Sequence, residues 1–233
     1  MSNPIHLDFT FKFSDGQSRQ FCTELDGDTL AIVPKSVEPL PEWTMLSFQK
    51  CLNCPLNSAT HPRCPVAVNL VEIAEFFKEY CSYEEVGVIV TTEQRTFSKQ
   101  TSAEEGLASL LQIYLAGSGC PTMDKMRPAL DNYLPFSTPA ESTYRFLAIY
   151  LTEQYLLRKN GKPDDMDVQR LPAFLKEMQE TVAAFLQRLK AIEKKDALRN
   201  SMVLISNLIS IAGRAIEAHK LKRLETIFLP AKN

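Results

Sequence analysis

The strongest constraint on the fold is a strict alternation of apolar and polar residues near the N-terminus. Residues 5–13 read IHLDFTFKF, with an apolar side chain on every second position. This two-residue period is typical of a strand that buries one face. The Asp-Gly pair at residues 15–16 is a strong hairpin signal, and a second strand is expected near residues 20–25. Residues 29–33 are a candidate third strand.

Helical patterns take over further along the chain. Residues 66–80 have helical spacing, whereas residues 85–91 and 94–99 are rich in Val, Ile, Thr and Phe, as expected for a second hairpin. Two segments have the pattern of a helix-capping box, Thr101-Ser-Ala-Glu104 and Thr138-Pro-Ala-Glu141. They predict helices that run to about residues 116 and 159.

Further helices are expected over residues 171–193 and 196–219, with a short one reaching about residue 228. The sequence therefore predicts an α+β fold, in which a small antiparallel sheet in the N-terminal part packs with a bundle of about five helices. Residues 1–120 form the β-rich part with the cysteine cluster and residues 121–233 the helical part. We expect the two parts to make one continuous globular unit.

Composition argues against several classes of function. The chain carries 26 basic and 28 acidic residues, so nucleic acid is not an expected partner. No segment has the roughly 18 uninterrupted apolar residues that a membrane span needs, and residues 202–218 are expected to form a buried helix. The basic run at residues 219–223 is expected to be the solvated end of a helix. Six cysteines without a secretion signal indicate a reducing, cytoplasmic location, where clustered thiols hold metal or do redox work.

The clearest candidate for a functional site is a cluster of residues of the types that bind metal ions. Cys51, Cys54, His61 and Cys64 fall within fourteen positions. Zinc prefers tetrahedral coordination by thiolate sulfur and imidazole nitrogen, so these four side chains would complete its shell. A complete shell leaves no position for a catalytic water. The segment therefore predicts a structural zinc site.

Cys120 is a competing ligand. It precedes a proline, as Cys54 and Cys64 do, and Cys-Pro pairs also occur in iron–sulfur ligation. Cys51, Cys54, Cys64 and Cys120 could hold zinc or an iron–sulfur cluster, with His61 beside it. The sequence leaves the choice between His61 and Cys120 open. The isolated Cys22 and Cys81 are expected to be buried as small apolar residues.

No catalytic arrangement is visible beside the cysteines. His6 and His219 have no visible Ser or Cys partner, so a catalytic triad has no support, and no Gly-rich phosphate loop occurs. Asp124, Arg127 and Arg145 could form a polar site facing the metal, but an ordinary Asp–Arg pair is the favoured interpretation. The leading hypothesis is a metal-binding protein with structural zinc that acts through contacts with an unknown protein partner. The alternative is an iron–sulfur or thiol-based redox enzyme or sensor, so enzymatic activity is left open.

Several short motifs outside the strands resemble those of an uncharacterised bacterial protein family. They are Trp43, the Cys51–Pro65 segment, Ser82-Tyr-Glu84, Gly119-Cys-Pro121, Leu134-Pro-Phe136 and Asp196–Asn200. The resemblance covers about residues 40–228, and the cysteine motifs are its most specific part. It implies a bacterial source and no assigned reaction.

Overall fold

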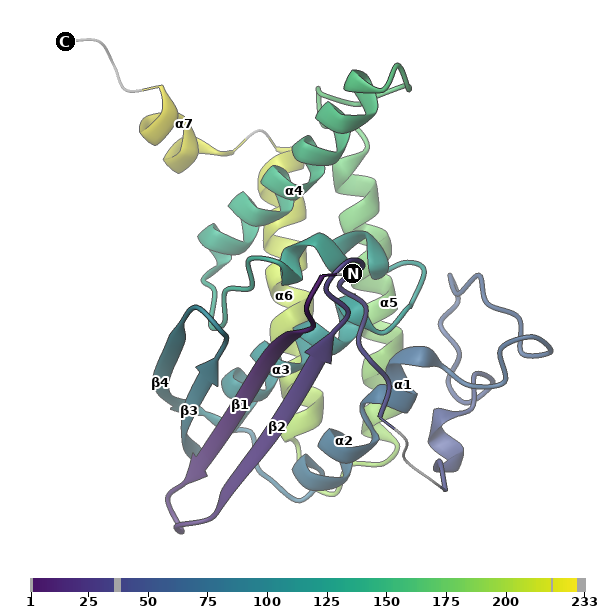
Figure 1. Ribbon diagram of the computed structural model, residues 1–233, viewed down its shortest axis with the longest axis vertical. Coiled ribbons are helices and arrows are strands. Elements are labelled where there is room, and N and C mark those ends of the chain that lie inside the picture. Colours follow the sequence, from purple (N-terminus) through teal and green to yellow (C-terminus); the bar gives the residue numbers. More distant parts are fainter. Residues whose placement is uncertain (1, 36–38, 219, 230–233) are drawn as a thin grey trace.

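The computed structural model describes residues 2–35, 39–218 and 220–229, and it has an α+β fold (Figure 1). The sheet contains β1 (Ile5–Phe13), β2 (Ser18–Leu25), β3 (Glu85–Thr91) and β4 (Thr96–Ser102). The helices are α1 (Pro65–Asn69), α2 (Val71–Phe77), α3 (Ala103–Gly117), α4 (Pro139–Lys159), α5 (Leu171–Lys190), α6 (Ala197–Glu217) and α7 (Lys222–Phe228). Two 3₁₀ segments are η1 (Glu42–Thr44) and η2 (Asp124–Leu130).

Both predicted hairpins form, and together they make one antiparallel sheet. The strand order is β2-β1-β3-β4, so β1 pairs with its own hairpin partner on one side and with β3 on the other. Phe11, for example, lies opposite Arg19 on β2 and Val88 on β3. The alternation in β1 is confirmed, since every second side chain from Leu7 to Phe13 is buried.

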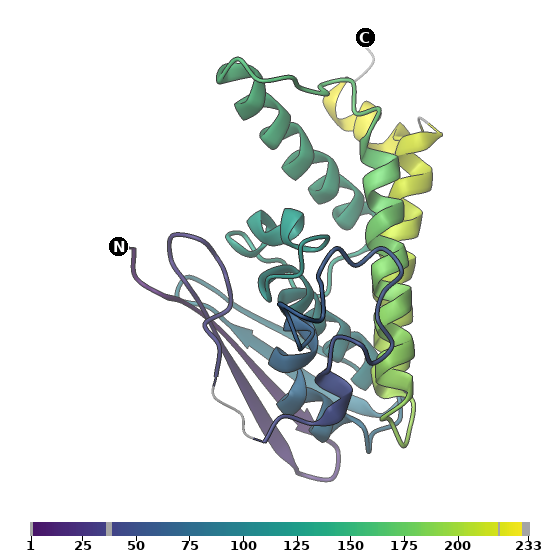
Figure 2. The same ribbon diagram turned by 90° about the vertical axis from the view of Figure 1, so that its right-hand side faces the viewer.

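The molecule is layered, with α3 between the sheet and the long helices α5 and α6 (Figure 2). Twelve of the fifteen α3 residues are buried, because one side of the helix faces the sheet and the other faces α6. A continuous cluster of buried apolar side chains runs from the β1 phenylalanines to Leu198, Met202 and Ile205 of α6. This packing makes α3 the central element of the core.

Gly106 allows α3 to approach the sheet closely. A Cβ at this position would lie 2.7 Å from Val88 Cγ2 and 3.0 Å from Phe11 Cε1. Gly106→Ala is therefore expected to destabilise the protein by about 1–3 kcal/mol through overpacking. Gly213→Ala in α6 is the matched control, since the nearest atom to its Cβ would be Leu175 Cβ at 3.7 Å.

The control substitution is expected to stabilise the protein by about 0.5–1 kcal/mol, because alanine is the better helix former. Urea unfolding of both variants measures the two changes in free energy. Equal effects of the two substitutions would contradict the close approach of α3 to the sheet.

Three details of the sequence prediction are wrong. Residues 29–33 do not form a strand. Residues 27–29 are a turn in which Asp26 Oδ1 accepts the Asp28 and Thr29 amides, Leu30 has a φ of 59°, and only an isolated Leu25–Ile32 bridge remains. The predicted helix at residues 66–80 divides into α1 and α2 at Leu70, whose ψ is 0°.

The third detail is the start of α3. Ser102, not Thr101, caps this helix and accepts the Glu105 amide, since residues 101 and 102 still pair with β3. The second predicted capping box is confirmed, with Thr138 and Glu141 bonded reciprocally.

The predicted C-terminal helices are confirmed, with α6 ending two residues before His219, which lies outside the described residues. Among the residues that the structure describes, no single helix has the length and apolar composition of a membrane span. The α6–α7 pair meets these criteria only when taken together, with a bend of 67°.

Candidate metal centre

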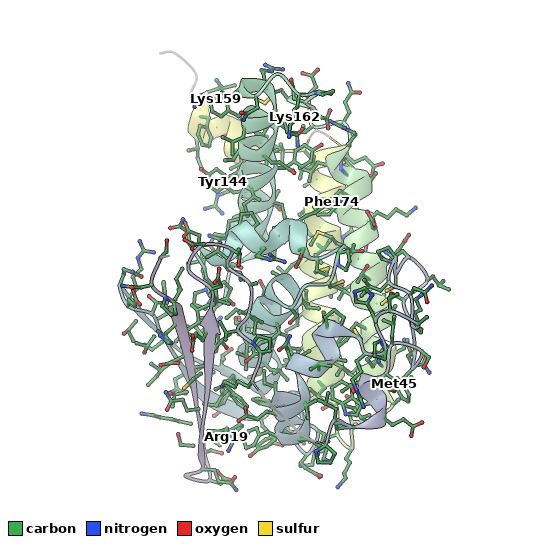
Figure 3. All side chains as sticks on the ribbon, turned by 45° about the vertical axis from the view of Figure 1, so that its right-hand side comes forward. Arg19, Met45, Tyr144, Lys159, Lys162 and Phe174 are labelled. Carbon is green, nitrogen blue, oxygen red and sulfur yellow. The ribbon has the colours of Figure 1, made fainter. Side chains whose placement is uncertain are left out.

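Residues 46–62 form a loop whose two ends are tied together. The Leu46 amide donates to the Pro62 carbonyl over 2.8 Å, and the Cys64 amide donates to the Thr44 carbonyl over 2.8 Å. The loop therefore leaves and returns at one place, with Met45 at its start (Figure 3). Cys64 is fixed where the loop ends, as the N-cap residue of α1, and Pro65 fills the first helical position.

The Cys51–Cys54 turn docks on α5. The Cys54 amide donates to the Cys51 carbonyl over 3.1 Å, which closes the turn. The side-chain amide of Asn53 donates to the Glu177 carbonyl over 3.0 Å and to Thr181 Oγ1 over 2.9 Å. Cys51 Sγ lies 3.9 Å from the Thr181 carbonyl oxygen. These contacts place both cysteines of the turn beside the buried side of α5.

Four half-buried, free cysteines line one pocket between this loop, α3 and α5: Cys51, Cys54, Cys64 and Cys120. The pocket is small, with about 20 Å³ of free space, and the rest of its wall is largely apolar, with Leu46, Val66, Leu115, Met123 and Phe185. Cys120 reaches it from the turn between α3 and η2, 56 positions after Cys64. The fold thus gathers sulfur atoms from three separate segments.

His61 lies away from these sulfurs. Its side chain is exposed and does not contribute to the pocket wall. Its Nδ1 is 3.0 Å from Thr60 Oγ1, and its amide donates to the Asn57 carbonyl over 2.7 Å. Of the two candidates for the fourth position, Cys120 is therefore the one that faces Cys51, Cys54 and Cys64.

The four thiols surround the pocket without being drawn together into a ligand shell. Within residues 2–35, 39–218 and 220–229, no three His, Cys, Asp or Glu side chains have the spacing that would hold a metal ion. Thiolate ligands lie about 2.3 Å from zinc. The sulfurs would have to move closer to bind an ion.

Two features of the pocket have opposite effects on the pKa values of the thiols: burial raises them, and nearby backbone amides lower them. Burial, together with a smaller effect of the three neighbouring thiols, raises the pKa of Cys51 to about 11. Burial also raises the pKa of Cys64 and Cys120. Backbone amides of the following turn oppose this rise, from residues 66 and 67 at Cys64 and from residues 122 and 123 at Cys120. Two Cys-Pro turns thus direct backbone N–H groups at their own sulfur, which favours the thiolate.

Arg188 is a buried cation in the same pocket. Its side chain is 1% exposed, and its Nη1 donates to the Trp43 carbonyl over 2.5 Å and to the Met45 carbonyl over 2.8 Å. Burial lowers the pKa of Arg188, and negative charge on Cys64, Cys51 and Cys54 would raise it.

The guanidinium of Arg188 lacks a carboxylate partner within the described part of the chain. Its Nε is buried without a hydrogen-bond partner there. A buried guanidinium of this kind is stabilised by nearby negative charge. The candidate groups that can supply it are the four thiols of the pocket.

Sequence reasoning did not identify Arg188. The available signal was a charged residue on the apolar stripe of α5, three positions after the buried Phe185 and next to the buried Leu189. Burial of Cys22 was wrongly predicted, because Cys22 lies on the outward face of β2 and is exposed, while Cys81 is half-buried. The Asp124–Arg127 ion pair is confirmed.

Comparisons with known proteins give a family but no activity. No curated protein and no solved structure matches the chain. A family model described as a domain of unknown function (DUF6901) matches residues 7–229. This match spans nearly the whole chain, and the protein therefore belongs to the DUF6901 family.

Proposed function

We propose that Cys51, Cys54, Cys64 and Cys120 bind one zinc ion and that this site is structural. The observation that carries the proposal is the convergence of these four free cysteines on one pocket from three segments of the chain. Four thiolates are a common ligand set of structural zinc. Apolar side chains would fill this pocket as well as four cysteines do. Packing alone therefore does not explain why four of the six cysteines lie there.

The charges around the pocket support a thiolate set. Four thiolates around one divalent ion leave an excess of negative charge, and Arg188 offers a buried positive charge beside them. The backbone amides that face Cys64 and Cys120 offset part of the remaining negative charge. Without bound metal, the raised pKa values of Cys51, Cys64 and Cys120 favour the neutral thiols, which supply no negative charge to the guanidinium.

The loop geometry supports closure around an ion. The ends of the loop are fixed by the hydrogen bonds at Leu46 and Cys64, whereas the turn that carries Cys51 and Cys54 is held mainly through the Asn53 side chain. Small movements of this turn toward Cys64 and Cys120 are compatible with the rest of the fold. The ion would then tie the loop to the α3–η2 connection.

A four-cysteine shell has a structural consequence. It leaves no coordination position for a water or substrate, so the ion stabilises the fold and takes no part in a reaction. We therefore propose that the protein acts through contacts with a protein partner. Six free cysteines suit a reducing compartment such as a bacterial cytoplasm.

Metal analysis of purified protein tests the proposal. One zinc per chain is expected, with loss of most of the zinc when Cys51, Cys54, Cys64 or Cys120 is changed singly to serine. Cys22→Ser, Cys81→Ser and His61→Ala are the controls and should keep the metal. If protein purified without oxygen contains iron and sulfide, the four sulfurs hold an iron–sulfur cluster and the zinc assignment is wrong. Protein free of metal, with all six thiols titratable, would contradict both.

A further inference from the structure

A second cavity adjoins the cysteine pocket. It has about 80 Å³ of free space between α3, α4, α6 and η2, and Leu115 and Met123 belong to the walls of both pockets. This space is smaller than the roughly 300 Å³ of the smallest usual small-molecule sites, so a ligand with a tail of several carbons requires an outward movement of α4. The wall is mainly apolar, with Leu115, Met123, Met126, Phe146, Met178 and Ile209 among the lining side chains.

The polar side chains of this cavity come largely from the start of α4. Ser137, Ser142 and Arg145 all line it. Ser142 and Arg145 are three positions apart on α4 and therefore share a helix face. The hydroxyl oxygens of Ser137 and Ser142 lie 3.2 Å apart. The cavity thus has one polar side set against an otherwise apolar wall.

Arg145 supplies a positive charge on that polar side. It is half-buried, and its Nη2 donates to the Ala129 carbonyl over 2.9 Å. Burial lowers its pKa, and no carboxylate of the described residues forms an ion pair with it. Arg127, in contrast, is paired with Asp124 on η2. A partly desolvated guanidinium that has further N–H groups to donate is suited to an anionic ligand.

The hydroxyl of Tyr133 already has a hydrogen-bond partner within the protein. It donates to the Ser109 carbonyl, and burial raises the pKa of Tyr133. No described His, Cys, Asp or Glu side chain lines the cavity, so acid–base or nucleophilic chemistry has no candidate group there. The cavity is built for binding.

We propose that this cavity binds a monocarboxylate with an unbranched apolar tail, of the size of a medium-chain fatty acid. Arg145 pairs with the carboxylate, and the Ser137 and Ser142 hydroxyls donate to its oxygens. The tail lies among Met123, Met126 and Met178, whose flexible thioether side chains adapt to chains of different length. A polar head and a long apolar wall match a ligand of one charge and one tail.

The position of α4 suggests how such a ligand would enter the cavity. Its first turns pack against η2 and α6, whereas its last turns diverge from α5 and α6 (Figure 2). Only three α4 side chains are buried. The helix that carries Arg145 is therefore held by fewer core contacts than α3 or α6, and a small outward shift would open the cavity.

Calorimetric titration of the full chain with sodium octanoate and with 1-octanol tests the head-group assignment. Octanoate is expected to bind at one site, and Arg145→Gln is expected to weaken octanoate binding by about tenfold or more, because a charge-assisted contact is lost. Octanol, which has the same tail and no charge, should bind both forms about equally.

Arg127→Gln is the matched control, since Arg127 lies on η2 and does not line the cavity. Equal losses in the Arg145 and Arg127 variants would overturn the proposal, as would an absence of octanoate binding. Octanol binding that falls in step with octanoate would also overturn the role of the charge.

A spectroscopic measurement on the unmodified chain covers the case in which Arg145→Gln fails to fold. With ¹³C-labelled methionine methyl groups, octanoate should shift the signals of Met123, Met126 and Met178. Met45 and Met166 do not line the cavity and should stay unchanged. Shifts confined to Met45 and Met166 would place the ligand elsewhere and contradict the proposal.

Discussion

Arg188→Met is expected to lower the free energy of unfolding by about 3 kcal/mol, because two buried carbonyl oxygens lose their donor. The Trp43 and Met45 carbonyls both accept from Arg188 Nη1 at the base of the cysteine loop. Methionine retains an apolar stem of similar length, so the cavity left behind is small. The decrease in the free energy of unfolding therefore measures mainly the contribution of the two hydrogen bonds and of the buried charge.

Lys190→Met is the control for this substitution. Lys190 lies two positions further along α5 and is exposed, so its replacement should change stability by less than about 0.5 kcal/mol. Chemical denaturation gives both values, and metal analysis of the Arg188→Met protein shows whether zinc is retained. A stability equal to that of the native protein would mean that the guanidinium contributes nothing to the loop, which contradicts the structural role given to it.

Removal of zinc is the second change with a large expected effect. A ligand that binds only the folded state at about a thousand times its dissociation constant stabilises that state by about 4 kcal/mol. For a chain of this size, we expect a strong chelator to lower the melting temperature by about 10 °C. The Cys51–Cys64 segment should also become the first site of cleavage by an added protease, because the ion no longer ties it to Cys120 in the α3–η2 connection.

Cys120→Ser distinguishes this effect from a direct action of the chelator on the protein. The variant lacks one of the four proposed ligands, so its melting temperature should be low and should not respond to the chelator. Calorimetry and limited proteolysis of native and variant protein, each with and without chelator, measure the four states. An equal response of both proteins to the chelator would contradict the proposed ligand set.

Much of the fold was predictable because its signals are local. The alternation in residues 5–13 and the Asp15-Gly16 turn determine the first hairpin, and Thr138 with Glu141 determines the start of α4. The pairing of β1 with β3 was not predictable, since the two strands are separated by about seventy residues and no local pattern names the partner. Residues 29–33 were wrongly predicted because the turn chemistry of Asp26 overrides their apolar character.

The candidate site divides in the same way. Cys51, Cys54 and Cys64 are close in sequence, so their clustering could be predicted. The choice between His61 and Cys120 depends on how α3 brings residue 120 back to the loop, which is a tertiary property. Arg188 was missed because a charged residue on a helix is usually exposed, and only the packing of α5 against the loop buries it.

The position of β1 inside the sheet has a consequence for the order of folding during synthesis. Its first edge can pair with β2 as soon as the hairpin has been made, but its second edge stays open until β3 follows. The cysteine loop, α1 and α2 are all synthesised in this interval. Cys51, Cys54 and Cys64 therefore leave the ribosome before the sheet is complete, and Cys120 follows only after β4 and α3. The proposed ligand set becomes complete when the sheet and its covering helix have both emerged, so metal capture would come after the first layer of the protein has formed.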